Sequence, residues 1–259
     1  KANNYNIQDR SDIEKTTDNY SIVVKNIEKT YQSCCSESNK AINNMSFTLK
    51  YGDCFAMLGV NGAGKSSMFK CLTNQILPEK GEIIINNLKV STDFESCRKL
   101  VGYCPQFDAI FEDMTVKENL LFYSNIKGIP SDMIENITTS IIKDMNLSEY
   151  TDKISGNLSG GNKRKLSVAI AMIGNPDIML LDEPSAGMDP EARRAMWSVI
   201  HKITKISKKS SVILTTHSME EAETLCHKMG IMVKGQFKCF GSAAVIKENY
   251  GKVSNFLFS

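Results

Sequence analysis

The residues at 59–66 have the types and spacing that suit the binding of a phosphate chain. They read Gly-Val-Asn-Gly-Ala-Gly-Lys-Ser and match the pattern G-x-x-x-x-G-K-[ST]. The glycines let backbone N–H groups turn toward an anion, Lys65 can reach β- and γ-phosphates, and the Ser66 hydroxyl can bind magnesium. An apolar run over 54–58 precedes the motif and a helical stretch over 67–75 follows it, which is the context that the pattern requires. A chance match in a Gly-rich turn is the weaker alternative.

Two carboxylates, Asp182 and Glu183, follow the apolar run over 178–181 and stand just before Pro184. In α/β folds, ligands bind at the carboxyl ends of such buried strands. Asp182 is therefore predicted to hold magnesium through water, and Glu183 to polarise an attacking water as a general base. Without the phosphate loop, an acidic strand end that merely begins a turn would be the better interpretation.

A third feature is the turn Leu158-Ser159-Gly160-Gly161-Asn162, which precedes a long predicted helix. The next three residues, 163–165, are Lys, Arg and Lys. Positive side chains at a helix start oppose the helix dipole, so the cluster is expected to cost stability unless an anion docks on it. The alternative is a Ser N-cap followed by exposed basic residues.

Composition excludes several classes of protein. The chain has 259 residues with 31 Lys and Arg against 29 Asp and Glu, and the absence of a long basic stripe argues against nucleic-acid binding. The eight cysteines form no C-x-x-C pair and no zinc pattern, which is typical of a cytosolic protein. The longest apolar runs fall far short of the roughly 20 residues that span a bilayer. The first residue is Lys and no apolar signal core follows, so we interpret the chain as a soluble fragment of a longer one.

The elements that position these residues follow from the apolar pattern. Residues 1–20 are polar and predicted to be a linker or disordered extension. Short strands are predicted over 22–27, 41–49, 54–58 and 82–85, helices over 116–127 and 133–145, and buried parallel strands over 178–181, 212–214 and 231–233. The pattern predicts an α/β protein in which strands and helix-length segments alternate.

Three further features complete a recognisable order: Gln106 in Tyr103-Cys104-Pro105-Gln106, the turn over 185–189, and His217 at the end of a predicted strand. From about Tyr31 to about Gly251 the chain resembles the nucleotide-binding domain of an ABC transporter, including the Leu158 turn that other P-loop enzymes lack. The resemblance implies a P-loop core of ABC type with an antiparallel β subdomain, mainly from the first 90 or so residues, and an inserted helical subdomain at about 107–165. The cofactors would be ATP and Mg2+.

The resemblance also implies roles for single residues. Tyr31 would stack on adenine, Gln106 would contact magnesium and sense the membrane domain, and His217 would hold the γ-phosphate. The turn Ser159, Gly160, Gly161 and Asn162 would bind the ATP held by a partner domain. The residues implied to bind the domain's own ATP are Tyr31, Gly59, Asn61, Gly62, Ala63, Gly64, Lys65, Ser66 and Ser67. Those implied to bind magnesium are Ser66, Gln106 and Asp182, and the catalytic ones are Glu183, His217 and Gln106.

Longer strings, including 102–108, 159–167, 182–194, 216–222 and 237–242, resemble the A subfamily of these transporters. The common signature ends in Gln where this chain has Asn162, a form typical of the second nucleotide-binding domain of full-length members. The resemblance implies an ABC domain over 21–251, a C-terminal extension beginning at 252–259, and pairing with a second nucleotide-binding domain. It further implies transmembrane domains in the parent chain, a place on the cytoplasmic face of a membrane, and lipid transport.

Two other functions are compatible with the phosphate loop. A non-transport ABC ATPase that acts as a mechanical clamp shares the phosphate loop, but Lys65 and Asp182 are too close in sequence for the long coiled coil of DNA-repair members. The ABC ATPases that act on ribosomes usually carry two domains on one chain and basic arms, and neither feature is found in this fragment. A small-molecule kinase would not need the Leu158 turn, and Glu183 followed by Pro184 fits a hydrolytic base better than a phosphoacceptor pocket.

Overall fold

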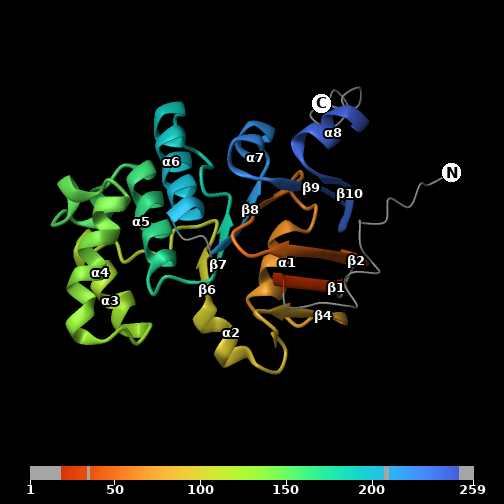
Figure 1. Ribbon diagram of the computed structural model, residues 1–259, viewed down its shortest axis with the longest axis horizontal. Coiled ribbons are helices and arrows are strands. Elements are labelled where there is room, and N and C mark those ends of the chain that lie inside the picture. The colour runs from red at the N-terminus through yellow and green to blue at the C-terminus, as the bar shows by residue number, and fades with distance from the viewer. Residues whose placement is uncertain (1–18, 34–35, 207–209, 251–259) are drawn as a thin grey trace.

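The computed structural model describes residues 19–33, 36–206 and 210–250 (Figure 1). The extension predicted over 1–20 lies almost wholly outside these residues, and the one predicted over 252–259 lies wholly outside them. Within the described residues, none of the helices has the length and apolar character needed to cross a bilayer.

A six-stranded sheet forms the centre of the molecule. Its order is β10 (Gln236–Gly241), β9 (Lys228–Val233), β3 (Cys54–Leu58), β8 (Ser211–Thr216), β7 (Ile178–Asp182) and β6 (Val101–Cys104). All neighbouring strands are parallel except β10, which pairs antiparallel with β9. The parallel strands therefore end at one common edge of the sheet.

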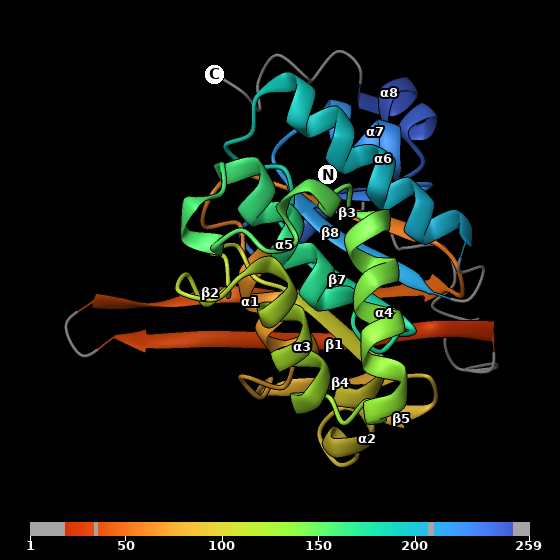
Figure 2. The ribbon, with the colours of Figure 1, turned by 90° about the vertical axis from the view of Figure 1, so that its left-hand side faces the viewer.

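A four-stranded antiparallel sheet forms a second layer (Figures 1 and 2). Its order is β2 (Ser36–Lys50), β1 (Tyr20–Ser33), β4 (Lys80–Ile85) and β5 (Leu88–Lys89). All four strands come from the first 90 residues, as the sequence predicted. Figure 2 shows β1 and β2 as a long ribbon that runs along this layer.

The central sheet is shared by two apolar cores. In β3, Cys54, Ala56 and Leu58 face one core, and Phe55 and Met57 face the other. Strands β7 and β8 alternate in the same way. Because successive side chains of a strand point to opposite faces, a strand covered on both sides reads as a continuous apolar run. That is why these three strands were visible in the sequence.

Helices cover the sheet on both sides. They are α1 (Lys65–Leu72), α2 (Phe94–Leu100), α3 (Val116–Ile126), α4 (Ser131–Asp144), α5 (Gly160–Met172), α6 (Pro190–Ile206), α7 (Met219–Leu225) and α8 (Ala243–Tyr250). Helices α3, α4 and α5 gather at one end of the molecule, away from the antiparallel sheet (Figure 1). The two helices predicted over 116–127 and 133–145 are present as α3 and α4.

Helix α3 begins at a capping box. The Thr115 hydroxyl accepts from the Glu118 N–H, and the Glu118 carboxylate accepts from the Thr115 N–H at 2.8 Å. This reciprocal pair satisfies two N–H groups that have no partner within the helix. Pro130 ends the connection between α3 and α4, because its ring is compatible with the start of a helix but not with its interior.

Asn119 on α3 fixes the segment that leads from β6 into the helices. Its side chain is fully buried, accepts from the Phe111 N–H at 2.9 Å, and donates to the carbonyls of Phe111 and Thr115 at 3.0 and 3.1 Å. It also donates to the Ser155 hydroxyl at 3.1 Å. One amide thus joins the segment before α3 to the turn before α5.

We expect Asn119→Ala to lower the free energy of unfolding by about 2 to 3 kcal/mol, because the backbone groups of Phe111 and the buried Ser155 hydroxyl lose their partner. Urea unfolding followed by circular dichroism measures the change. Asn125→Ala on the same helix is the control, since the exposed Asn125 amide donates to the carbonyl of Leu121 four residues earlier. Equal losses in the two variants would contradict the role given to Asn119.

Candidate nucleotide site

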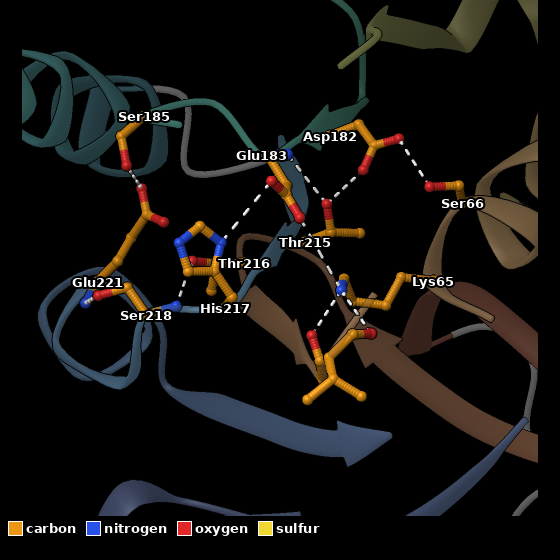
Figure 3. Close-up of polar contacts among 12 residues, drawn as sticks. Lys65, Ser66, Asp182, Glu183, Ser185, Thr215, Thr216, His217, Ser218 and Glu221 are labelled. Carbon is orange, nitrogen blue, oxygen red and sulfur yellow. Dashed lines mark hydrogen bonds and ion pairs between the residues drawn. The ribbon is translucent and has the colours of Figure 1, made fainter. Parts of the chain in front are cut away.

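The predicted site residues meet at the carboxyl edge of the central sheet. The phosphate loop follows β3, Asp182 ends β7, and His217 follows β8. Register brings them together, because Leu58 pairs with Thr216 and Asp182 pairs with Thr215. Figure 3 shows these side chains converging from the two strand ends and from the start of α1.

The phosphate loop is shaped by positions that admit only glycine. Gly64 has φ 106°, and a Cβ there would lie 2.2 Å from the Ala41 carbonyl oxygen. A Cβ on Gly59 would lie 2.6 Å from the Met232 carbonyl oxygen. The loop is therefore pressed against β2 and β9, and its backbone can form a concave anion site at the start of α1.

Lys65 lies within this loop and is 6% exposed. Its Nζ donates to the carbonyls of Gly59 and Val60 at 2.6 and 3.3 Å, and stands 3.9 Å from a Glu183 carboxylate oxygen. Burial lowers the pKa of Lys65, and the nearby Glu183 and Asp182 carboxylates oppose that shift. The Lys65 ammonium group is thus held where it can offer a positive charge and N–H donors to a bound phosphate.

Asp182 links the loop to two strands. It is 4% exposed, accepts from the Ser66 hydroxyl at 3.3 Å, and also accepts from the Thr215 hydroxyl. The hydroxyl of Ser66 and the carboxylate of Asp182 are oxygen donors, which Mg2+ prefers. These two residues fit a magnesium ion that would also bind the phosphate held by the loop.

Glu183 points its carboxylate into the same space. One of its oxygens is near Lys65, and the other lies 3.7 Å from Nδ1 of His217, a side chain that is 64% exposed (Figure 3). Its backbone has φ 49°, which an L residue with a side chain rarely adopts. The Glu183 N–H donates to the Thr215 hydroxyl at 2.9 Å.

Gln106 and Tyr31 are placed less directly. Cys104, at the end of β6, pairs with Leu181. The chain at Gln106 therefore lies just beyond the sheet, next to β7, the strand that carries Asp182. Its side chain is exposed, and its carbonyl accepts from Arg164 at 3.3 Å. Tyr31 lies on β1, pairs with Asn39 and is 39% exposed.

The turn over 159–162 begins α5. The Ser159 hydroxyl accepts from the Asn162 N–H at 3.3 Å, which is an N-cap, and both Ser159 and Gly160 are exposed. A Cβ on Gly160 would meet no atom within 4 Å. The turn thus presents open backbone at the molecular surface.

The basic cluster after this turn differs from the prediction. Arg164 is 5% exposed and points into the protein, where it donates to backbone carbonyls, and Lys163 pairs with Glu112 at 2.7 Å. Two of the three positive charges are therefore already neutralised or hydrogen bonded within the chain. The cluster does not need an external anion for stability.

Sequence reasoning missed two supporting contacts. The Thr215 hydroxyl bridges the carboxylate of Asp182 and the N–H of Glu183. The buried Glu221 carboxylate accepts from the Ser185 hydroxyl at 2.6 Å and from the Trp197 indole at 3.0 Å (Figure 3 shows the Ser185 contact). Glu221 lies in the string 216–222 quoted above and Thr215 directly precedes that string, but only the fold shows which residues they contact.

Comparisons with known proteins agree with this geometry. The family model described as "ABC transporter" matches residues 42–186. The mouse glucosylceramide transporter ABCA12 is 46% identical over 87% of this chain, and the human retinal-specific phospholipid-transporting ATPase ABCA4 is 45% identical over 83% of it. The match covers 9% of each of these two relatives, so the chain spans about a tenth of their length.

Solved structures show the same fold. The ATP-binding subunit of an ABC transporter is 25% identical, with a TM-score of 0.77, over 89% of this chain and 93% of that one. The cbiO1 protein of Clostridium perfringens is 24% identical, with a TM-score of 0.79, over 92% and 96% of the two chains. From its phosphate loop, its paired strand-end carboxylates and these matches, the chain belongs to the ABC transporter family and has the fold of that family's ATP-binding cassettes.

Proposed function

We propose that this domain binds Mg-ATP and hydrolyses it to power transport across a membrane. The observation that supports this most directly is the convergence of Lys65, Asp182, Glu183 and His217 on one space beside the phosphate loop. A loop that only held a phosphate would not need a general base there. The ABC domain would extend over 21–251, with its helical subdomain at about 107–165.

Each side chain has a task in this proposal. Residues 59, 61–64, 66 and 67 donate backbone or hydroxyl groups to the phosphates, Lys65 neutralises the β- and γ-phosphate charge, and Tyr31 stacks on adenine. Ser66, Asp182 and Gln106 would hold magnesium, which supplies further charge neutralisation. Glu183 takes a proton from the attacking water, and His217 donates to the γ-phosphate as its charge develops.

The turn over 159–162 supports pairing with a second nucleotide-binding domain. It lies at an exposed helix start with open backbone, where its N–H groups and helix dipole suit an anion. The domain's own phosphate loop begins a different helix, α1. We infer that the turn binds the ATP of a partner domain in a head-to-tail pair, so each complete site uses both domains.

The exposed aromatic side chains after Gln106 support contact with transmembrane domains. Phe107 is 83% exposed and Phe111 is 42% exposed, with the Phe111 ring against Phe122 at a centroid distance of 4.9 Å. Ile110 and Met114 in the same segment are half-buried. An apolar surface beside Gln106 would let a membrane domain sense the nucleotide site.

We propose that the cargo is lipid. We also propose that the parent protein is an integral membrane protein and that this domain lies on the cytoplasmic face of the membrane. The support is the names of the relatives, a glucosylceramide transporter and a phospholipid-transporting ATPase. Hydrolysis here supplies a conformational cycle, so specificity would reside in the transmembrane part.

We expect Glu183→Gln to lower kcat by about 10²-fold or more while the Kd for ATP changes less than about twofold, because only the base is lost. Lys65→Ala should instead weaken ATP binding. Phosphate release and fluorescent-nucleotide titration measure the two quantities. Glu149→Gln, at an exposed position in the 3-10 turn over 148–150, is the control and should behave as wild type. Unchanged turnover in Glu183→Gln would contradict the assignment of the base.

Glu183→Gln should also associate only in the presence of ATP, because the nucleotide would join the two halves of each site. Adding Gly160→Glu should abolish this association and leave ATP binding by the monomer intact. The new side chain has open space and suits a helix start, but its charge would repel a partner's phosphates. Sedimentation velocity with and without ATP measures the pair, and a monomer fraction that ignores ATP would contradict the composite site.

In the full transporter reconstituted in defined lipids, we expect Phe107→Asp to remove stimulation of ATPase activity by lipid and to leave the isolated domain's ATP affinity unchanged. Ile126→Asp is the control, since Ile126 is 64% exposed but lies at the far end of α3. ATPase activity is measured against a panel of lipids, peptides and sugars. Stimulation by a hydrophilic solute and by none of the lipids would overturn the lipid assignment.

A further inference from the structure

Arg164 is a buried charge that the proposed chemistry does not use. It lies near the start of α5, the helix that follows the turn over 159–162, and its side chain is directed into the protein with 5% exposure. A buried guanidinium is costly unless its donors are satisfied. Here they are satisfied by two other segments of the chain.

On one side, the guanidinium donates to three successive carbonyls. Nη2 donates to the carbonyl of Asp182 and, at 3.2 Å, to that of Glu183, while Nε donates to that of Pro184 at 3.2 Å. The first two of these three residues, Asp182 and Glu183, carry the two carboxylates of the site. Arg164 therefore holds the peptide groups on both sides of the Glu183 Cα atom.

On the other side, Nη1 contacts the segment that leaves β6. It donates to the carbonyls of Pro105 and Gln106 at 2.6 and 3.3 Å, and to the Asp108 carboxylate at 3.1 Å. A planar fork with five N–H donors can span two segments in this way. A lysine ammonium keeps the charge but has one nitrogen and cannot do so.

The backbone of Glu183 explains why such a clamp is needed. Its φ of 49° is in the left-handed region, where all other described residues besides glycine are Asn, with the single exception of Lys234. A residue of this kind persists there only when its surroundings hold it. The Thr215 hydroxyl accepts from the Glu183 N–H, and Arg164 donates to the Glu183 carbonyl.

We propose that Arg164 is a positioning residue that holds the left-handed backbone of Glu183, aims the Glu183 carboxylate toward Lys65, and ties this geometry to the Gln106 segment and to α5. The inference rests on the proposed ATPase function. It adds that a movement of α5, or of the segment after β6, would shift the general base Glu183 through the Arg164 side chain.

The test compares ATPase activity in two backgrounds. Arg164→Lys should lower kcat by about 10- to 100-fold with a Kd for ATP within about twofold of wild type, because several hydrogen bonds to the backbone at Glu183 are lost. In the Glu183→Gln background the same change should leave the residual single-turnover rate unaltered, since Arg164 acts through that carboxylate. Arg98→Lys, at an exposed ion pair on α2, is the control and should change neither value.

Asp108→Asn provides an independent variant. Its side chain is 27% exposed, so the change should fold, and it weakens one contact of Arg164 while keeping an acceptor. It should lower kcat less than Arg164→Lys does, again only when Glu183 is present, and the Arg164→Lys/Asp108→Asn pair should be no slower than Arg164→Lys alone. If Arg164→Lys does not fold, this background dependence of Asp108→Asn decides the question.

Unchanged kcat in a folded Arg164→Lys protein would overturn the inference. An equal fall in both backgrounds would also overturn it, because a general loss of structure would slow the residual reaction too. Failure of the proposed function gives a different result from these two outcomes. In that case Glu183→Gln would turn over ATP no more slowly than the wild-type protein.

Discussion

Asp182 is a buried carboxylate, and the arrangement of the site depends on how its charge is accommodated. An unpaired carboxylate in a protein interior would cost several kcal/mol or take up a proton. Here the hydroxyls of Ser66 and Thr215 donate to it, and the ammonium of Lys65 lies in the same site. Those three partners come from the start of α1 and from β8. Holding one anion therefore fixes the phosphate loop, the end of β7 and the end of β8 relative to each other.

The same constraint explains the shape of the surrounding fold. The partners of Asp182 can meet only if β3, β8 and β7 are adjacent, parallel and in register, so that their ends reach one edge. Helix α1 must then begin directly at that edge, which the glycines at 59 and 64 permit. The charges of the site thus place tight limits on the central strands, whereas α3 and α4 are constrained by packing and by local hydrogen bonds such as those of Asn119.

The parts of this structure that could be predicted from sequence are those set by local chemistry or by continuous burial. Strand β3 matches its predicted limits at both ends, because a strand covered on both faces needs an unbroken apolar run. Helix α3 begins where Thr115 and Glu118 form a capping box, and α4 begins after Pro130. The phosphate loop and the two carboxylates were visible for the same reason, since their chemistry needs fixed residue types at fixed spacing.

What could not be predicted depends on contacts between distant segments. Strand β6 has four residues, including a glycine, and carries no periodic signal. The helix after the phosphate loop ends at Leu72 rather than continuing to residue 75, because the chain turns through a left-handed residue at Asn74. The inward direction of Arg164 was missed because its partners are mostly backbone carbonyls, which leave no trace in a sequence.

The division of the interior into two cores has a consequence for how the molecule can open. Strands β3, β7 and β8 belong to both cores, so neither core can be lost without exposing a face of the central sheet. Helices α3 and α4 contribute to only one of the two. Segments that share fewer buried contacts detach at lower free energy than the whole domain unfolds. The helical end can therefore undergo partial, reversible opening while amide protons in the central strands remain protected until the entire sheet melts.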